Sequence, residues 1–248
     1  MLLKGKTAVI TGCLQGIGLA TLELFVKNGA NVFACCQNED AAFTSYIGEM
    51  EKEHGVEITP VYFDLMDNEA VKNGVKTIQK QKKPIDVLVN VAGMNLDALF
   101  HMVTMDQLEK TFQVNFFSQI LLTQYMTKLM LRHGKGSVIN ISSISGIDGN
   151  LGQLAYASSK AALIAATKTI SQELGPKGIR VNAIAPGVIE TDMTKNLPEE
   201  ALERQMKRSN IHRLGLPEEV AKAILYLASD LSSFVTGQVI RVDGGIGC

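Results

Sequence analysis

The 248-residue chain has no tryptophan, only six prolines, four cysteines and four histidines. The cysteines (Cys13, Cys35, Cys36 and Cys248) form no Cys-x-x-Cys pair and have no ligand-like spacing with the histidines. The sequence therefore predicts no metal site. Cys35 and Cys36 are adjacent and cannot easily bridge without strain. We expect free thiols in a reducing compartment.

Neither sign of charge is in excess, because 24 Lys and Arg face 25 Asp and Glu. This balance argues against nucleic-acid binding, because a nucleic-acid-binding protein needs an excess of Lys and Arg to neutralise phosphate groups. No apolar run approaches the roughly 18 residues of a membrane span. At the start of the chain, Lys4 follows two leucines and interrupts any signal-peptide core. We expect a cytoplasmic protein that binds neither nucleic acid nor membranes.

What the sequence does have is an alternation of short apolar runs with longer segments of helical period. The runs predicted as strands are 7–11, 31–35, 58–63, 85–89, 137–141, 180–184 and 238–242. The longest predicted helices span about 105–132 and 155–174. Strands separated by helices run parallel and are covered on both faces. The sequence therefore predicts a single α/β domain over residues 1–248, with a doubly wound (Rossmann) seven-stranded parallel sheet.

One polar segment interrupts this alternation. Residues 191–213 are charged and poor in apolar side chains, and they lie between a predicted strand and a predicted helix. We interpret this segment as a lid inserted into the domain.

A glycine-rich turn, Thr11-Gly12-Cys13-Leu14-Gln15-Gly16-Ile17-Gly18, follows the first predicted strand and opens a helix. Gly12 permits the tight turn, Gly16 lets the backbone approach a pyrophosphate, and Gly18 lets the helix pack against the strand. The helix N-terminus then holds the anion. The turn predicts a dinucleotide site.

The spacing Thr-Gly-x-x-x-Gly-Ile-Gly resembles that of the short-chain dehydrogenase/reductase family. Further motifs follow in family order along the chain: Asp64-Leu65, Asn90-Val91-Ala92-Gly93, Val114-Asn115, Ile141-Ser142-Ser143, Tyr156-Ala157-Ser158-Ser159-Lys160 and Pro186-Gly187. Val91 departs from the family's asparagine at that position. The resemblance covers essentially the whole chain, and it implies an NAD(P)-dependent oxidoreductase that forms a homotetramer through its central helices.

Tyr156 and Lys160 are four residues apart, so both project from one face of a predicted helix. A nearby ammonium group is expected to lower the tyrosine pKa toward the working pH. The resemblance implies that Tyr156 donates a proton to a carbonyl oxygen, that Lys160 binds the nicotinamide ribose, and that Ser143 hydrogen-bonds the reacting oxygen. Ser142 is the alternative to Ser143, which the family's interval to the tyrosine favours.

The resemblance gives two further residues a role in the site. Asn115 would kink its helix and hold a water for proton relay, although a helix-interior amide satisfied by backbone groups is the alternative. Gln153 would contact substrate together with Ser143 and Tyr156.

The resemblance also implies which residues bind the cofactor. Asp64 would contact the adenine, and the Ile189 backbone and Thr191 would hold the nicotinamide carboxamide. The full set is Gly12, Gln15, Gly16, Ile17, Gly18, Gln37, Asp64, Leu65, Asn90, Ala92, Gly93, Tyr156, Lys160, Pro186, Gly187, Ile189 and Thr191.

The choice between NADP and NAD is expected at the end of the second strand. Cys36 stands where NAD-dependent relatives carry an acid, which argues against strict use of NAD. Gln15 and Gln37 stand where NADP-dependent relatives usually carry a cation. We expect NADP (NADPH) as the cofactor, with NAD possible.

Segments 152–153, 187–194 and 213–221 resemble the bacterial 3-oxoacyl-acyl-carrier-protein reductases within this family. This implies NADPH-dependent reduction of a 3-oxoacyl thioester, bound to acyl carrier protein, to the 3-hydroxyacyl form. A dehydrogenase of a sugar, polyol or other secondary alcohol is the alternative, so the partner is a carrier protein or a small-molecule ketone or alcohol. A non-catalytic cofactor-binding scaffold is disfavoured because Tyr156 and Lys160 are both present.

An acidic carrier protein would need a basic patch. Cations gather just before the fifth predicted strand, and another follows the helix of Tyr156: Lys128, Arg132, His133, Lys135 and Lys177. An ordinary solvated helix end explains them equally well.

Overall fold

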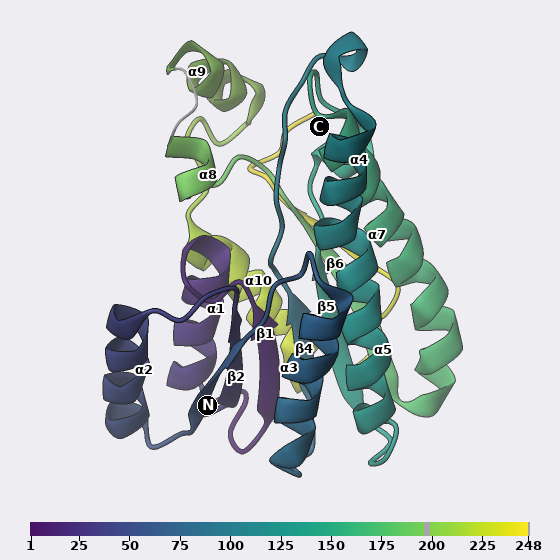
Figure 1. Cartoon of the computed structure of the whole chain (residues 1–248). Helices are drawn as coiled ribbons and strands as arrows, with labels where there is room; N and C mark the ends of the chain where they lie inside the picture. Colours follow the sequence, from purple (N-terminus) through teal and green to yellow (C-terminus); the bar gives the residue numbers. More distant parts are fainter. Residues whose placement is uncertain (196–198, 248) are drawn as a thin grey trace.

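A single parallel sheet forms the centre of the molecule (Figure 1), in a computed structural model that describes residues 1–195 and 199–247. The strands are β1 (Thr7–Thr11), β2 (Asn31–Cys36), β3 (Ile58–Tyr62), β4 (Val87–Asn90), β5 (Gly136–Ile141), β6 (Ile179–Pro186) and β7 (Val239–Val242). Their order is β3-β2-β1-β4-β5-β6-β7. The predicted seven-stranded doubly wound sheet is confirmed.

Helices cover both faces of the sheet, as parallel crossovers require. They are α1 (Gly16–Lys27), α2 (Ala41–His54), α3 (Asn68–Lys80), α4 (Met105–Phe112), α5 (Ser118–Met130), α6 (Ser145–Asp148), α7 (Leu154–Leu174), α8 (Asp192–Lys195), α9 (Glu199–Arg208) and α10 (Pro217–Ala228). Single 3-10 turns occur at Phe100–Met102, Gly175–Lys177 and Asp230–Ser232. Within the described ranges, no helix is long and apolar enough to cross a membrane.

The core has two halves, one on each face of the sheet. On one face, α1, α2 and α10 pack around Phe25, Leu22 and Ile224, all fully buried. On the other, α3 and α5 pack around Ile78 and Met126. The apolar runs from which the strands were predicted lie between these two layers of helices.

The strand order reverses between β1 and β4, since the chain proceeds outward to β3 and then returns to β4. Connections on the two sides of this point leave in opposite directions, so a crevice opens at the carboxyl ends of the strands. The glycine-rich turn after β1 and the loop after β4 meet there.

The predicted helical stretch over 105–132 is present as α4 and α5. A π-helical turn, Gln113–Phe117, joins α4 to α5 without a break. Asn115 lies inside this turn, and its side chain holds the backbone of Met94 on the loop after β4. Hydrophobic periodicity continues across the turn, so the pattern alone gives no sign of it. π-Helical turns occur frequently at functional sites.

The polar segment 191–213 contains α8 and α9, which lie beyond the carboxyl edge of the sheet (Figure 1). Residues 196–198 of this segment lie outside the described residues. Arg213 anchors its far end through a bidentate ion pair with Glu219 on α10, at 2.7 and 2.8 Å. The Arg213 side chain and the Leu216 backbone N–H lower the pKa of Glu219 to about 2.

Candidate active site

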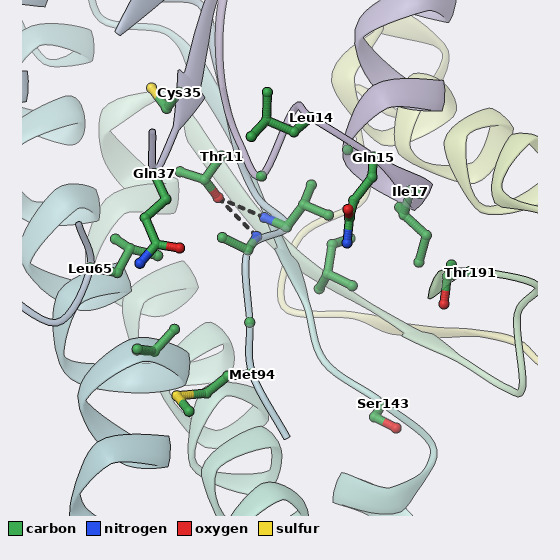
Figure 2. Close-up of a pocket in the computed structure, with 18 of the residues that line it drawn as sticks. Thr11, Leu14, Gln15, Ile17, Cys35, Gln37, Leu65, Met94, Ser143 and Thr191 are labelled. Atoms are coloured by element: carbon green, nitrogen blue, oxygen red, sulfur yellow. Dashed lines mark hydrogen bonds between the residues drawn. The ribbon is translucent and has the colours of Figure 1, made fainter. Parts of the chain in front are cut away.

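A cleft of about 570 Å³ opens at the carboxyl ends of the strands. Figure 2 shows its lining, to which β1, β2, β5 and β6 contribute. It brings together most of the residues expected from the sequence: Gly12, Gln15, Gly16, Ile17, Gly18, Gln37, Asp64, Leu65, Ala92, Gly93, Ser143, Tyr156, Lys160, Pro186, Gly187, Ile189 and Thr191. Asn90, Asn115 and Gln153 are the expected residues that do not line it.

The glycine-rich turn is packed too closely for side chains. A Cβ at Gly18 would stand 2.0 Å from the carbonyl oxygen of Gly12, and one at Gly12 would stand 3.1 Å from the Cα of Ala92. Gly12 also has a φ of +74°, which disfavours any side chain. Thr11 fixes the neighbouring loop, because its hydroxyl oxygen accepts hydrogen bonds from the N–H groups of Val91 and Ala92 (Figure 2).

The N-terminus of α1 faces this cleft with the features of an anion site. Gln15 at the N-cap makes no side-chain capping hydrogen bond, and the first turn of the helix contains no acid. The first N–H groups of a helix lack intrahelical partners and carry the positive end of the helix dipole. This end of α1 therefore suits a phosphate group.

Ser143 and Tyr156 come together from different elements. Ser143 follows β5, where its hydroxyl oxygen accepts a hydrogen bond from the Ser145 N–H at 3.1 Å. Tyr156 lies in the first turn of α7. Burial raises the pKa of Tyr156, a hydrogen bond with Ser143 opposes that shift, and Asp97 adds to it. The expected depression of the tyrosine pKa by Lys160 is therefore wrong for this structure, because desolvation of the phenolate dominates.

Lys160 is buried behind Tyr156. Its ammonium group lies 5.6 Å from the centre of the Tyr156 ring and donates a hydrogen bond to the Ile141 carbonyl at 2.8 Å. Burial lowers the pKa of Lys160 to about 8. The Ser142 hydroxyl donates a hydrogen bond to the Lys160 carbonyl at 2.9 Å and so links the end of β5 to α7. Ser143, not Ser142, is the serine that hydrogen-bonds Tyr156.

The three expected residues that do not line the cleft all support its walls. Asn115 binds both the N–H and the carbonyl of Met94, at 2.8 and 2.9 Å, so its amide is satisfied largely by backbone. Asn90 donates to Thr123 and Asn140 in the core. The amide oxygen of Gln153 accepts from Ser145 and Asn150, both at 2.9 Å, beside the Ser143 turn rather than in the cleft.

Comparisons with known proteins agree with this geometry. A family model described as Enoyl-(Acyl carrier protein) reductase matches residues 12–247. The chain is 44% identical over 246 residues to the 3-oxoacyl-[acyl-carrier-protein] reductase FabG of Thermotoga maritima, with 99% of each chain covered. It is 37% identical to the protein of the same name from Aquifex aeolicus, with 98% of each covered. The chain belongs to the short-chain dehydrogenase/reductase family.

A solved structure of another member is similar along its whole length. It is described as a putative NAD(P) dependent gluconate 5-dehydrogenase from Beutenbergia cavernae with bound NADP. The TM-score is 0.92 at 32% identity, over 98% of this chain and 96% of that one. The protein is therefore an NAD(P)-dependent oxidoreductase of this family, and the glycine-lined cleft with the open N-terminus of α1 fits a dinucleotide.

Several residues that line the cleft had no role predicted for them from the sequence: Thr11, Leu14, Cys35, Phe63, Met66, Met94, Val114, Ile141 and Thr194. Thr11, Cys35 and Ile141 lie at or near the carboxyl ends of predicted strands, so the rule that sites gather there could have found them. Met94 and Val114 could not have been found in this way, because the loop after β4 and the π-helical turn bring them to the cleft.

The expected basic patch lies at the opposite edge of the sheet from the cleft. Arg132 follows the C-terminal end of α5, and Lys135 immediately precedes β5. Lys135 lies 3.8 Å from Asp86, which precedes β4. Lys177 ends the 3-10 turn Gly175–Lys177, and one residue separates it from β6. Because all these strands run parallel, the patch lies at their amino ends, whereas Ser143 and Tyr156 lie at the carboxyl ends.

Proposed function

We propose that this protein reduces a 3-oxoacyl thioester, presented by an acyl carrier protein, to the 3-hydroxyacyl thioester with NADPH. The observation that carries the proposal is the arrangement of Ser143, Tyr156 and Lys160 on one wall of the dinucleotide cleft. The FabG relatives, which match along their whole length, support this substrate class.

Tyr156 is the proton donor in this proposal. Burial raises its pKa, so the phenol is protonated at neutral pH and can donate to the carbonyl oxygen as that oxygen gains charge. Ser143 hydrogen-bonds the same oxygen. Removing a comparable donor to an oxyanion costs about a hundredfold or more in rate. NADPH, when bound, supplies the hydride.

Lys160 holds positive charge beside the phenol. Its ammonium lies 5.6 Å from the Tyr156 ring centre, where it stabilises the phenolate that remains after proton transfer. Its hydrogen bond to the Ile141 carbonyl fixes this position. The π-helical turn supports the same wall, because Asn115 also donates to the Ser159 hydroxyl on α7 at 3.1 Å. Asn115 therefore acts as a positioning residue for this wall.

The remaining lining residues would hold the cofactor. Gly12, Gly16 and the N-terminus of α1 would bind the pyrophosphate, Asp64 would contact the adenine, and Ile189 and Thr191 would bind the nicotinamide carboxamide. Segment 191–213 closes over substrate as a lid. A Cβ at Gly16 would stand 3.2 Å from the Thr191 side chain, so the start of this segment already contacts the glycine-rich turn.

The protein acts in the cytoplasm as a homotetramer in this proposal. Within one chain the basic patch and the cleft lie at opposite edges of the sheet, so a carrier bound at Arg132 and Lys177 would lie at the edge away from Tyr156 of the same chain. On α5, Met126 and Met130 are fully buried within the chain, so they offer no surface for an interface. Phe117, which is 51% exposed, is the better interface candidate.

The rim of the cleft favours an acyl substrate over the sugar or polyol alternative. The loops that follow β4 and β5 are joined by a hydrogen bond from the Ala98 N–H to the Gly152 carbonyl. Beside this link they expose large apolar side chains, including Phe100 at 81% and Leu151 at 84%. Such a surface suits an alkyl chain.

A substrate comparison tests the proposal. NADPH oxidation is measured with acetoacetyl-CoA, and NADP+ reduction with gluconate and a panel of sugars, polyols and secondary alcohols. We expect rapid turnover of acetoacetyl-CoA and little of the others. A larger kcat/KM for gluconate or a polyol would replace the proposal with the alternative, and no turnover of any compound would favour a non-catalytic scaffold.

A further inference from the structure

Arg241 joins parts of the chain that are far apart in sequence. It lies on β7, and its guanidinium donates hydrogen bonds to both oxygens of the Asp148 carboxylate, from Nη1 at 3.4 Å and from Nη2 at 3.0 Å. Its Nε donates to the Asp243 carboxylate at 2.8 Å, and Nη2 also donates to the Ile246 carbonyl at 2.6 Å. One half-buried guanidinium therefore links the end of α6 to the C-terminal segment of the chain.

The turn of Ser143 continues directly into α6. The Ser143 hydroxyl accepts a hydrogen bond from the N–H of Ser145, the first residue of this helix. Because α6 has only four residues, it is not stable by itself, and contacts from outside must fix it. At its first residue the Ser145 hydroxyl donates to Gln153 at 2.9 Å, and at its last residue Asp148 pairs with Arg241. The ion pair therefore fixes the end of α6 that lies farther from Ser143.

Arg241 acts from outside the cleft. It lines a neighbouring cavity of about 300 Å³ together with Asp243, whereas Ser143 lines the dinucleotide cleft. The Asp243 side chain is 6% exposed, and a carboxylate so buried needs a cation or several hydrogen-bond donors. Arg241 supplies the cation, and this buried pair keeps the guanidinium oriented toward Asp148. Any effect of Arg241 on the reaction must pass through the residues that it holds.

We propose that Arg241 is a positioning residue, which holds the Ser143 hydroxyl in place for the reacting oxygen through Asp148 and α6. The inference rests on the proposed function, in which Ser143 hydrogen-bonds that oxygen. A donor to a developing oxyanion must be precisely placed, and a misplacement of about 1 Å can cost up to about a hundredfold in rate. Loss of the ion pair releases the last residue of α6, so the Ser143 turn becomes freer to make such shifts.

Steady-state kinetics of single and double variants test the inference. Asp148→Ala removes the carboxylate at the end of α6 and leaves Arg241 paired with Asp243. We measure kcat and KM for acetoacetyl-CoA, and the Kd of NADP+, for Asp148→Ala in the wild-type background and in Ser143→Ala. Arg241→Met, alone and combined with Asp148→Ala, shows whether the two residues act together.

Asp230→Ala is the matched control. Asp230 also pairs with a cation far away in the sequence, Lys6 at 2.6 Å, but it lies at the amino ends of the strands, away from the cleft. Hydrogen exchange at the backbone amides of residues 144–149, followed by mass spectrometry, is a second measurement, which requires no turnover.

We expect Asp148→Ala to lower kcat by about tenfold, with KM and the Kd of NADP+ changed by less than about twofold. In Ser143→Ala the same substitution should change kcat by less than about twofold, because the hydroxyl that the ion pair positions is gone. Arg241→Met should lower kcat at least as much, and adding Asp148→Ala to it should cause no further fall. Exchange at 144–149 should be faster in both variants and unchanged in Asp230→Ala.

An unchanged kcat in Asp148→Ala would overturn the inference. An equal fall in the wild-type and Ser143→Ala backgrounds would also overturn it, because the ion pair would then act by a route other than Ser143. If the wild type turns over gluconate and not acetoacetyl-CoA, the proposed function fails, and the same ratios measured with gluconate decide the role of Arg241. If no compound is turned over, the proposed function fails as well, and unchanged exchange at 144–149 in Asp148→Ala would overturn the inference.

Discussion

Tyr156 is half-buried and Lys160 is buried, and desolvation shifts the pKa of each toward its neutral form. The tyrosine pKa rises and the lysine pKa falls to about 8. Near neutral pH the tyrosine is therefore a phenol ready to donate, and the lysine is still largely charged. Protonated lysine beside protonated tyrosine is the state that reduction of a ketone requires.

Lys160→Met tests the cost of this burial. The lysine pKa is lower in the folded chain, so the unfolded chain binds more protons between about pH 8 and 10.5. Burying the charged lysine lowers the free energy of unfolding. This loss of stability is fully present below pH 8 and disappears as the pH rises to about 10.5. The variant also loses the hydrogen bond to the Ile141 carbonyl, which offsets part of the gain. We expect its free energy of unfolding at pH 7 to exceed that of wild type by about 1–2 kcal/mol.

The measurement is the free energy of unfolding in urea at several pH values from 7 to 10. The difference in the free energy of unfolding between variant and wild type should become smaller as the pH rises. Lys168→Met is the control, because Lys168 is an exposed lysine on the same helix. A gap that does not change with pH would contradict the burial argument.

At the residue scale, the sequence identified the side chains that meet in the cleft but not their partners. Tyr156, Lys160 and Ser143 could be found from spacing and family resemblance. The partners of Gln153 could not, because they depend on how the turn after β5 folds back on Ser145. The raised pKa of Tyr156 also required the structure, since it depends on desolvation and not on sequence distance from Lys160.

At the scale of single elements, the glycine-rich turn and the π-helical turn differ in how far sequence reveals them. The turn after β1 is encoded by glycines whose spacing has a steric reason. The π-helical turn has no such signature in its periodicity. In the structure, its role is shown by the hydrogen bonds of the Asn115 side chain with the N–H and the carbonyl of Met94 on the neighbouring loop.

Gly18→Ala tests the packing of the glycine-rich turn. The added Cβ would stand 2.0 Å from the Gly12 carbonyl oxygen, and neither backbone can give way without moving α1. We expect a loss of about 1–3 kcal/mol in the free energy of unfolding and weaker NADP+ binding. Thermal unfolding and calorimetry measure the two effects.

Gly48→Ala is the matched control in α2, where a Cβ meets nothing within 4 Å. It should stabilise the protein by about 0.5–1 kcal/mol through helix propensity and leave NADP+ binding unchanged. Equal stability of the two variants would show that the turn tolerates a side chain at Gly18.

At the scale of the whole molecule, strand order creates the site. The order of the strands reverses between β1 and β4, and the loops that leave their carboxyl ends form the cleft. The alternation of apolar runs and helices predicts this parallel sheet. A parallel sheet also implies that Arg132 and Lys177, which precede strands, lie at the edge away from the site, as the structure shows.

Proton donation by Tyr156 in the reduction of a 3-oxoacyl thioester is tested most directly by the Tyr156→Phe variant. The initial rate of NADPH oxidation with acetoacetyl-CoA is measured in wild type and variant, with NADP+ binding measured in parallel. We expect a fall in kcat of about a hundredfold or more with NADP+ affinity nearly unchanged. Full activity in Tyr156→Phe would contradict it.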